Sequence, residues 1–331
     1  MEVALLLLIL YNNVMYKKIK NSLLILIIII IFCATFEIFS SARSEPKIGL
    51  ALGGGAARGF AHIGVLKVLE REGIKIDYMA GTSIGSLIGA FYALGFEAEE
   101  IEKYLLEENF TKYISFKNIT FELEEYQNKK TLGVFINLPK LIASPGWPRG
   151  LISTIAIRDK LDQVFNWAHF EYDLKIPFKT VATDLITGEK IVMDSGKVSN
   201  GVAASISIPG IFYPFELGNK ILVDGGLKDP VPVDVVREMG ADIVIAVSLQ
   251  GIMEEKKDPT NIISIAERSI DIMIADLTTL SLIGSDLIIE PKYQGEVSFL
   301  MGTKEREAII EQGEIEAKEH IASIKEAIDG F

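Results

Sequence analysis

The sequence has few of the side chains that usually perform covalent or metal chemistry. Its 331 residues include one cysteine and three histidines. Cys33 lies in an N-terminal apolar segment, so the rest of the chain offers no disulfide, no cysteine-ligated zinc and no cysteine nucleophile. His62, His169 and His320 do not stand in loops after predicted strands, where a serine–histidine–aspartate triad would place its base. A triad of that kind is therefore a poor interpretation.

Positive charge is outweighed by negative charge, with 33 lysine and arginine residues against 45 aspartate and glutamate residues. The whole chain has a net charge of −12. Residues 1–44 have a net charge of +2, so the remaining residues have a net charge of −14. A body this acidic argues against a nucleic acid partner, because binding to a phosphate backbone needs clustered lysine and arginine. It also disfavours simple electrostatic docking on anionic lipid.

The N-terminal 44 residues read as a signal peptide or membrane anchor. From Met15 a basic head is followed by an apolar run from Leu23 to Phe36 and then by small residues near Ser40. This order predicts a protein that is exported to, or anchored in, the bacterial periplasm or cell envelope. Cleavage and retention both stay open, and the apolar patch at residues 1–14 leaves the true start at Met1 or Met15.

The remaining chain alternates predicted strands and helices, which is typical of an α/β fold with a mainly parallel sheet. We expect strands at 47–52, 76–81, 178–193 (two strands joined by a turn), 220–224 and 241–249, and helices at 58–73, 84–95, 97–108, 153–165, 199–208, 261–284 and 304–328. The last two helices flank the stretch "SDLIIEP". Residues 109–150 are less regular and are expected to form a variable cap or loop. We find no repeat and no interdomain linker. The predicted organisation is an N-terminal segment at 1–44, a catalytic domain at 47–237, and a C-terminal strand with helices at 238–331 that completes the same fold.

The stretch "AGTSIGS" holds a candidate nucleophile, Ser83, in a G-x-S-x-G pattern. A serine on a tight strand-to-helix turn has a strained backbone, and its neighbours at Gly81 and Gly85 must lack side chains. The hydroxyl then projects near a helix N-terminus, whose dipole favours negative charge. Taken alone, the same residues also suit an ordinary helix N-cap.

The candidate base is Asp224 in "ILVDGG", an acid at the end of a predicted strand. We expect its carboxylate at the same edge of the sheet as Ser83. A free aspartate has a pKa of about 3.9 and is a weak base, so it needs partial burial and hydrogen-bond contact with the serine. An Asp-Gly turn without catalytic meaning is the alternative.

The loop "GGGAARG" offers main-chain donors to an anion. Backbone N–H groups from Gly53 to Ala56, at the start of a helix, suit a phosphate or an oxyanion. A dinucleotide fingerprint would need a glycine where Arg58 stands, and a P-loop would need Gly-Lys-Ser/Thr. An oxyanion hole fits better, because the chain also offers a serine and an acid.

"GGGAARG", "GTSIG" and "DGG", in this order, resemble the patatin-like phospholipase family over about residues 47–236. The resemblance implies a three-layer α/β/α sandwich and a serine–aspartate dyad without histidine, cofactor or metal. It assigns Ser83 as nucleophile, Asp224 as base, and Gly53, Gly54, Gly55 and Arg58 as the oxyanion region.

The resemblance therefore implies a lipid acyl hydrolase, of the phospholipase, lysophospholipase or carboxylesterase type, that forms an acyl-enzyme. A lipid ester would be its substrate and a membrane surface its partner. Two alternatives stay open: a non-catalytic lipid-binding envelope protein on the same fold, because a fold does not fix a function, and, with less support, a serine peptidase.

Overall fold

A computed structural model of the chain describes residues 45–107, 149–150, 152–249, 262–293 and 301–331, together with Met15, Lys20, Leu24 and Ile25. The chain divides into two units, Met1–Glu45 and Pro46–Phe331, and the second carries the fold described below. The predicted signal or anchor segment and nearly all of the predicted cap at 109–150 lie outside the described residues. Within the described parts of the chain, no helix is long and apolar enough to cross a bilayer.

The second unit is built on an eight-stranded sheet with the order β5-β6-β3-β2-β1-β7-β8 and with β4 paired to β3. The strands are β1 (Ile48–Leu52), β2 (Tyr78–Thr82), β3 (Phe178–Asp184), β4 (Lys190–Met193), β5 (Phe215–Leu217), β6 (Lys220–Asp224), β7 (Ile243–Val247) and β8 (Leu287–Ile289). β3, β2, β1, β7 and β8 are parallel, whereas β4, β5 and β6 are antiparallel to their neighbours. The predicted α/β fold with a mainly parallel sheet is confirmed.

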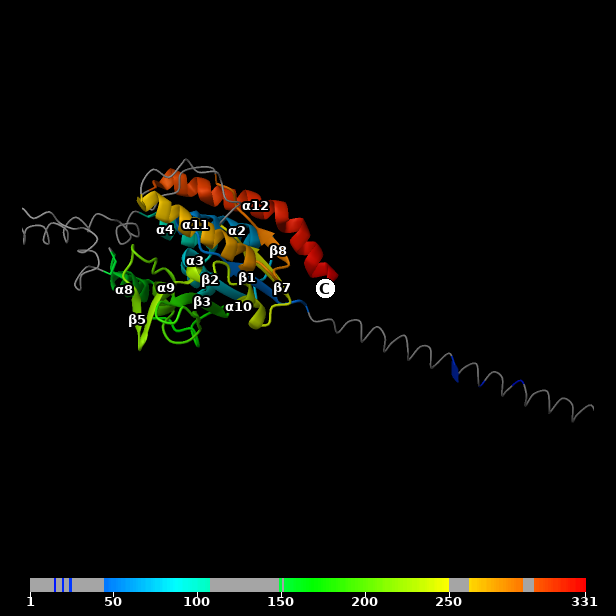
Figure 1. Cartoon of the computed structure of the whole chain (residues 1–331). Coiled ribbons are helices and arrows are strands. Elements are labelled where there is room, and N and C mark those ends of the chain that lie inside the picture. The colour runs from blue at the N-terminus through cyan, green and yellow to red at the C-terminus, as the bar shows by residue number, and fades with distance from the viewer. Residues whose placement is uncertain are drawn as a thin grey trace, which may run out of the picture. The chain divides into compact units, whose positions relative to one another are not determined.

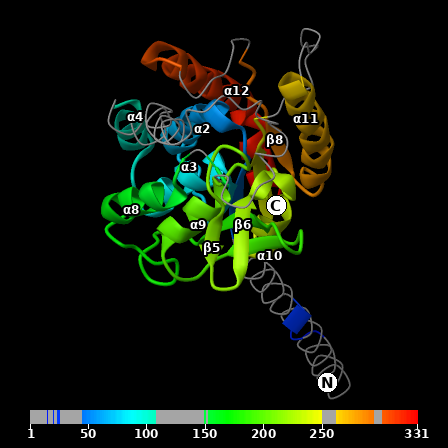
Figure 2. The same cartoon turned by 60° about the vertical axis from the view of Figure 1, so that its left-hand side comes forward.

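Helices cover both faces of this sheet. They are α2 (Phe60–Arg71), α3 (Ile84–Ala93), α4 (Ala98–Leu106), α8 (Thr154–Val164), α9 (Val198–Ser205), α10 (Val233–Glu238), α11 (Ile262–Ser281) and α12 (Thr303–Gly330), with short 3-10 turns η1 (Ala56–Gly59) and η3 (Gly225–Leu227). Figure 1 shows α2 and α12 on one side of β1 and β7, with α10 on the other. Figure 2, turned by 60°, shows the same separation.

The two faces differ in thickness because the strand residues alternate in size. Leu50 and Leu52 of β1 point into the large core, which they share with α2, α3, α4, α8, α9 and α12. Ala51 points to the opposite face, where small residues of β2, β3 and β7 pack against the valines of α10. The result is a three-layer sandwich with one thick and one thin helical layer.

Two elements were not predicted from the sequence. β5 is three residues long and forms a hairpin with β6, and α10 follows Pro232 within a stretch that reads as a turn. Both are too short to display a periodic pattern of apolar residues.

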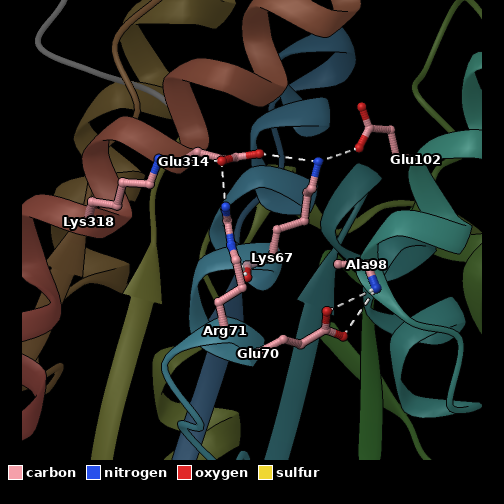
Figure 3. Close-up of polar contacts among 7 residues, drawn as sticks. All are labelled: Lys67, Glu70, Arg71, Ala98, Glu102, Glu314 and Lys318. Carbon is pink, nitrogen blue, oxygen red and sulfur yellow. Dashed lines mark hydrogen bonds and ion pairs between the residues drawn. The ribbon is translucent and has the colours of Figure 1, made fainter.

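Helix α12 packs along α2, which begins beside the glycine loop. A Cβ added to Gly64 of α2 would lie 2.0 Å from the Ile310 carbonyl oxygen, and one added to Gly313 would lie 2.0 Å from that of Ala61. Only glycine allows the two backbones to come this close. Ion pairs flank the crossing: Lys67 lies 2.7 Å from Glu102 of α4 and 3.2 Å from Glu314 of α12 (Figure 3).

Candidate active site

Ser83 occupies the turn between β2 and α3 and has a backbone that only glycine adopts without strain. Its φ is +55° and its ψ is −125°. Such a conformation costs on the order of 1–3 kcal/mol and persists only where the surrounding structure imposes it. The side chain is mostly buried, with 6 % of the residue exposed.

Backbone packing imposes this turn. A Cβ on Gly81 would lie 2.4 Å from the Gly85 carbonyl oxygen, and a Cβ on Gly85 would lie 2.2 Å from that of Leu52. Both flanking glycines are therefore required by close contact between β1, β2 and the first turn of α3. The steric reason for the G-x-S-x-G pattern is the one expected from the sequence.

The structure brings Asp224 directly to Ser83. The Ser83 hydroxyl donates to Asp224 Oδ2 at 2.6 Å, and the Gly226 N–H donates to Asp224 Oδ1 at 2.8 Å. Both carboxylate oxygens are thus occupied, and the residue is 7 % exposed. This pair sits at the end of the sheet where β1 and β2 finish.

Asp224 reaches the edge of the sheet near Ser83 on a strand that runs against the parallel part of the sheet. The ends of parallel strands meet at one edge, but β6 runs antiparallel to β3. β3 extends beyond the end of β2, since Thr82 pairs with Val181 and β3 continues to Asp184. β6 begins beside that extension and runs back until Asp224 pairs with Ala182, next to Ser83.

Burial changes the acidity of Asp224. Removal from water disfavours the ionised form and raises the pKa of this carboxyl group from 3.8 to about 6. The hydrogen bonds from Ser83 and Gly226 act in the opposite direction and are the smaller effects. A carboxylate with this pKa is a better proton acceptor near neutral pH than an exposed aspartate.

Ser205, at the end of α9, holds the nucleophile turn and was missed in the sequence. Its hydroxyl accepts the Ser83 backbone N–H at 2.8 Å and donates to the Val181 carbonyl at 2.6 Å. The side chain is fully buried. The segment "AASISIPG" contains this serine, but nothing in its spacing indicates a contact with a residue 122 positions away.

The glycine loop lies beside Ser83, but not all of its N–H groups face outward. A Cβ on Gly54 would lie 3.3 Å from the Ser83 Cβ. The Gly53 N–H donates to Val247 and the Gly54 N–H donates to Pro230, at 3.0 and 2.9 Å. These two N–H groups are therefore occupied, and any oxyanion donor from the loop has to come from Gly55 or Ala56.

Arg58 contributes to the loop through its backbone. Its N–H donates to the Gly55 carbonyl at 3.1 Å and closes the turn η1. Its half-buried side chain has no ion pair or hydrogen bond within the described residues. The assignment of Gly53, Gly54, Gly55 and Arg58 to an oxyanion region stays a prediction.

His62 of α2 contacts the glycine loop through a hydrogen bond. It is fully buried on α2, and its Nε2 lies 2.8 Å from the Gly53 carbonyl oxygen, to which it donates as the neutral tautomer. Burial lowers the pKa of this imidazole to about 4, so it stays uncharged at neutral pH. This agrees with a packed structural histidine.

In the described ranges, no histidine contacts Ser83, and no three histidine, cysteine, aspartate or glutamate side chains group as metal ligands.

Fold and site together define a class: α/β proteins that carry a serine on a strained strand–helix turn, with an acid rather than a histidine against its hydroxyl. The family model "Patatin-like phospholipase" matches residues 50–237. The chain belongs to this family.

Several proteins are similar to this chain over somewhat more than half of its length. An NTE family protein of Mycobacterium tuberculosis is 32 % identical over 208 residues, which is 63 % of this chain and 50 % of that protein. Lysophospholipase NTE1 of Mycosarcoma maydis is 34 % identical over 210 residues, 62 % of this chain and 10 % of that protein. The chain thus spans half or less of the length of these relatives. The crystal structure of VipD from Legionella pneumophila aligns over 85 % of this chain and 67 % of that one, with 14 % identity and a TM-score of 0.45.

Proposed function

We propose that the protein is a lipid acyl hydrolase in which Ser83 and Asp224 form a catalytic dyad. One observation carries the proposal: a serine hydroxyl on a strained turn donates a 2.6 Å hydrogen bond to a buried carboxylate. Membership of the patatin-like phospholipase family, and the name of the lysophospholipase relative, support a lipid ester as substrate.

The first half-reaction transfers the acyl group to the serine. Asp224 takes the proton from Ser83 Oγ as this oxygen attacks the ester carbonyl carbon. The carbonyl oxygen becomes an oxyanion, which the N–H groups of Gly55 and Ala56 and the start of α3 would stabilise. Collapse of the tetrahedral intermediate breaks the bond to the alcohol, and Asp224 returns its proton to that leaving oxygen. An acyl ester on Ser83 remains.

The second half-reaction releases the fatty acid. Asp224 takes a proton from water, the water oxygen attacks the acyl carbonyl carbon, and the bond to Ser83 Oγ breaks as that oxygen regains the proton. The free acid leaves and the dyad is restored. Ser205 keeps the turn in place throughout, since it holds the Ser83 N–H rather than the reacting hydroxyl.

The test is hydrolysis of short-chain nitrophenyl esters by the wild type, Ser83→Ala and Asp224→Asn, with Ser207→Ala as matched control. Ser207 Oγ only donates to the Ala203 carbonyl within its own segment. Both dyad variants should lose at least about a thousandfold in kcat, whereas the control should not. Wild-type turnover in either dyad variant would refute the dyad.

Labelling with a fluorophosphonate separates the remaining readings. Attachment to Ser83 supports an active serine, and its absence in a folded wild-type protein would favour a lipid-binding envelope protein without catalysis. Cleavage of casein without cleavage of lipid esters would favour a serine peptidase.

We also propose that the protein is exported or anchored at the bacterial cell envelope and works at a membrane surface. The basic head and apolar run near the N-terminus support this, as does a lipid substrate. Fractionation of cells and N-terminal sequencing of the purified protein test it. Recovery in the cytosol with residues 1–44 intact would contradict it.

A further inference from the structure

The first turn of α12 lies at the same edge of the sheet as Ser83. α2 begins where β1 ends, and α12 runs parallel to α2, because Arg306 contacts Phe60, Gly313 contacts Ala61, and Lys325 pairs with Glu72. The N-termini of both helices therefore face the end of the sheet that carries Ser83. α12 lies outside the segment that the family model matches.

A small apolar cluster connects α12 to the candidate active site. Met301 and Ile309 pack with Ala57 of the glycine loop, with Phe60, and with Ile84, the residue after Ser83. Within the cluster, Ile84 lies close to the loop itself, since a Cβ on Gly59 would lie 2.0 Å from the Ile84 side chain. Arg306 borders this cluster, and its guanidinium carbon lies 5.5 Å from the centre of the Phe60 ring.

The burial of Arg306 is unusual for a charged side chain. It is 7 % exposed, and within the described residues it forms no ion pair, although the same chain pairs most of its partly buried lysines and arginines with acids. Burial lowers the pKa of its guanidinium group, and the nearest opposing charge is Glu305. An unpaired charge at a largely buried position is costly, and the Arg306 nitrogens are not among the fully buried atoms that lack a partner, so they stay open to an anionic ligand from outside.

The helix start adds donors beside the arginine. The carbonyl of the N-cap residue Gly302 accepts the Arg306 N–H, and Gly302 has no side chain with which to cap the first N–H groups of α12. These groups and the helix dipole favour an anion. The exposed Glu305 folds back toward Gly302, where a Cβ would lie 2.8 Å from its Oε2. Its negative charge therefore lies near the start of α12, where it would oppose the binding of an anion.

We propose that Arg306 and the first turn of α12 bind a phosphate group of the substrate while Ser83 attacks its ester. This inference rests on the proposed function, and what it adds is the residue and the helix that recognise the phosphate of the substrate. Arg306 then acts as a specificity-determining residue supplied from outside the family-matched segment. A planar guanidinium suits bidentate contact with phosphate oxygens.

The test compares two substrates that differ by one phosphate, palmitoyl lysophosphatidic acid and monopalmitoyl glycerol, in identical non-ionic detergent micelles. The full chain is assayed as wild type, Arg306→Met, Glu305→Gln and Arg158→Met. Arg158 is the matched control, an arginine on α8 that pairs with its neighbour Asp159. The readout is the ratio of kcat/KM for the two substrates, which a loss of folded protein does not change.

The wild type should prefer the phosphate-bearing lipid. Arg306→Met should lower the ratio about tenfold, equivalent to ~1.4 kcal/mol. Glu305→Gln, at an exposed position that should fold normally, should raise it, and Arg158→Met should leave it unchanged. An equal loss on both substrates in Arg306→Met, or an unchanged ratio, would overturn the assignment.

Two further outcomes separate the inference from the proposed function. Hydrolysis of monopalmitoyl glycerol without preference for the phosphate would refute the subsite and leave the acyl hydrolase intact, whereas hydrolysis of neither lipid would refute both. If millimolar inorganic phosphate alters turnover of the neutral ester and Arg306→Met abolishes this effect without changing the substrate ratio, the ligand is a free anion and the headgroup assignment is wrong.

Discussion

Replacement of Asp224 by asparagine should inactivate the protein and, at neutral pH, stabilise it. The ionised Asp224 carboxylate of the wild type is destabilised by burial, as its raised pKa indicates. Asparagine has nearly the same shape without the charge. Its carbonyl oxygen can accept the Gly226 N–H, and its amide can face the Ser83 hydroxyl, so both existing contacts keep a partner.

The magnitude follows from the pKa. The folded protein holds the Asp224 proton up to a pH of about 6, whereas the unfolded chain releases it near 3.8. Wild-type stability from this group is therefore full below 3.8 and is lost as pH rises through 6. Each pKa unit is worth ~1.4 kcal/mol, so the variant should gain on the order of 3 kcal/mol relative to wild type, most of it between about pH 4 and 7.

The assay is urea unfolding of both proteins at a series of pH values, read as the difference in the free energy of unfolding. Asp229 is also buried with a pKa raised to about 6, but it is present in both proteins and cancels in the difference. A difference that stays flat from about pH 4 to 8 would refute a raised pKa at Asp224. A variant that is less stable at every pH would show that the ionised carboxylate contributes to the fold.

Three other outcomes follow from the same geometry. On a neutral nitrophenyl ester, kcat/KM should rise with pH with a midpoint of about 6, because Asp224 must be ionised to accept the Ser83 proton. A midpoint near 4 would contradict the burial of Asp224. Ser205→Ala should leave the Ser83 N–H unpaired, which should cost ~1–3 kcal/mol of stability and lower kcat more than it raises KM. The control Ser207→Ala should change neither stability nor kcat in this way. An equal effect of the two substitutions would show that Ser205 has no special role. Gly81→Ala should place a Cβ 2.4 Å from a carbonyl oxygen and destabilise the protein by ~3 kcal/mol. The control Gly330→Ala adds a Cβ with no atom within 4 Å and should change the melting temperature little. Similar melting temperatures for the two variants would show that the turn at Ser83 can relax.

Long elements with clear periodicity were predictable from the sequence. The apolar runs of β1 and β7 and the pattern of α2 place these elements within two residues of their observed bounds. β5 and α10 were missed, because three to six residues cannot establish a period. The direction of β6 was hidden for another reason: it depends on how far β3 extends beyond β2, and that is set by tertiary pairing.

The candidate site was partly predictable because its local parts carry local signals. A glycine two positions on each side of Ser83 indicates a tight turn, and an acid before two glycines indicates an unobstructed side chain. The supporting contacts carry no such signal. Ser205 reaches Ser83 from another helix, and Val247 and Pro230 take up two loop N–H groups that the sequence presents as free. A sequence shows which N–H groups a loop contains, but whether each one is free or already hydrogen-bonded depends on residues that the fold brings next to it.

The position of β7 bears on how the chain can be divided. It lies inside the sheet, between β1 and β8, although the family match ends at residue 237. A fragment cut there would leave β1 as a bare edge with unsatisfied main-chain groups, and would deprive Gly53 of the acceptor that fixes its peptide. A fragment or domain fusion based on the homologous segment alone should therefore aggregate, and residues 238–331 belong to the smallest piece worth purifying.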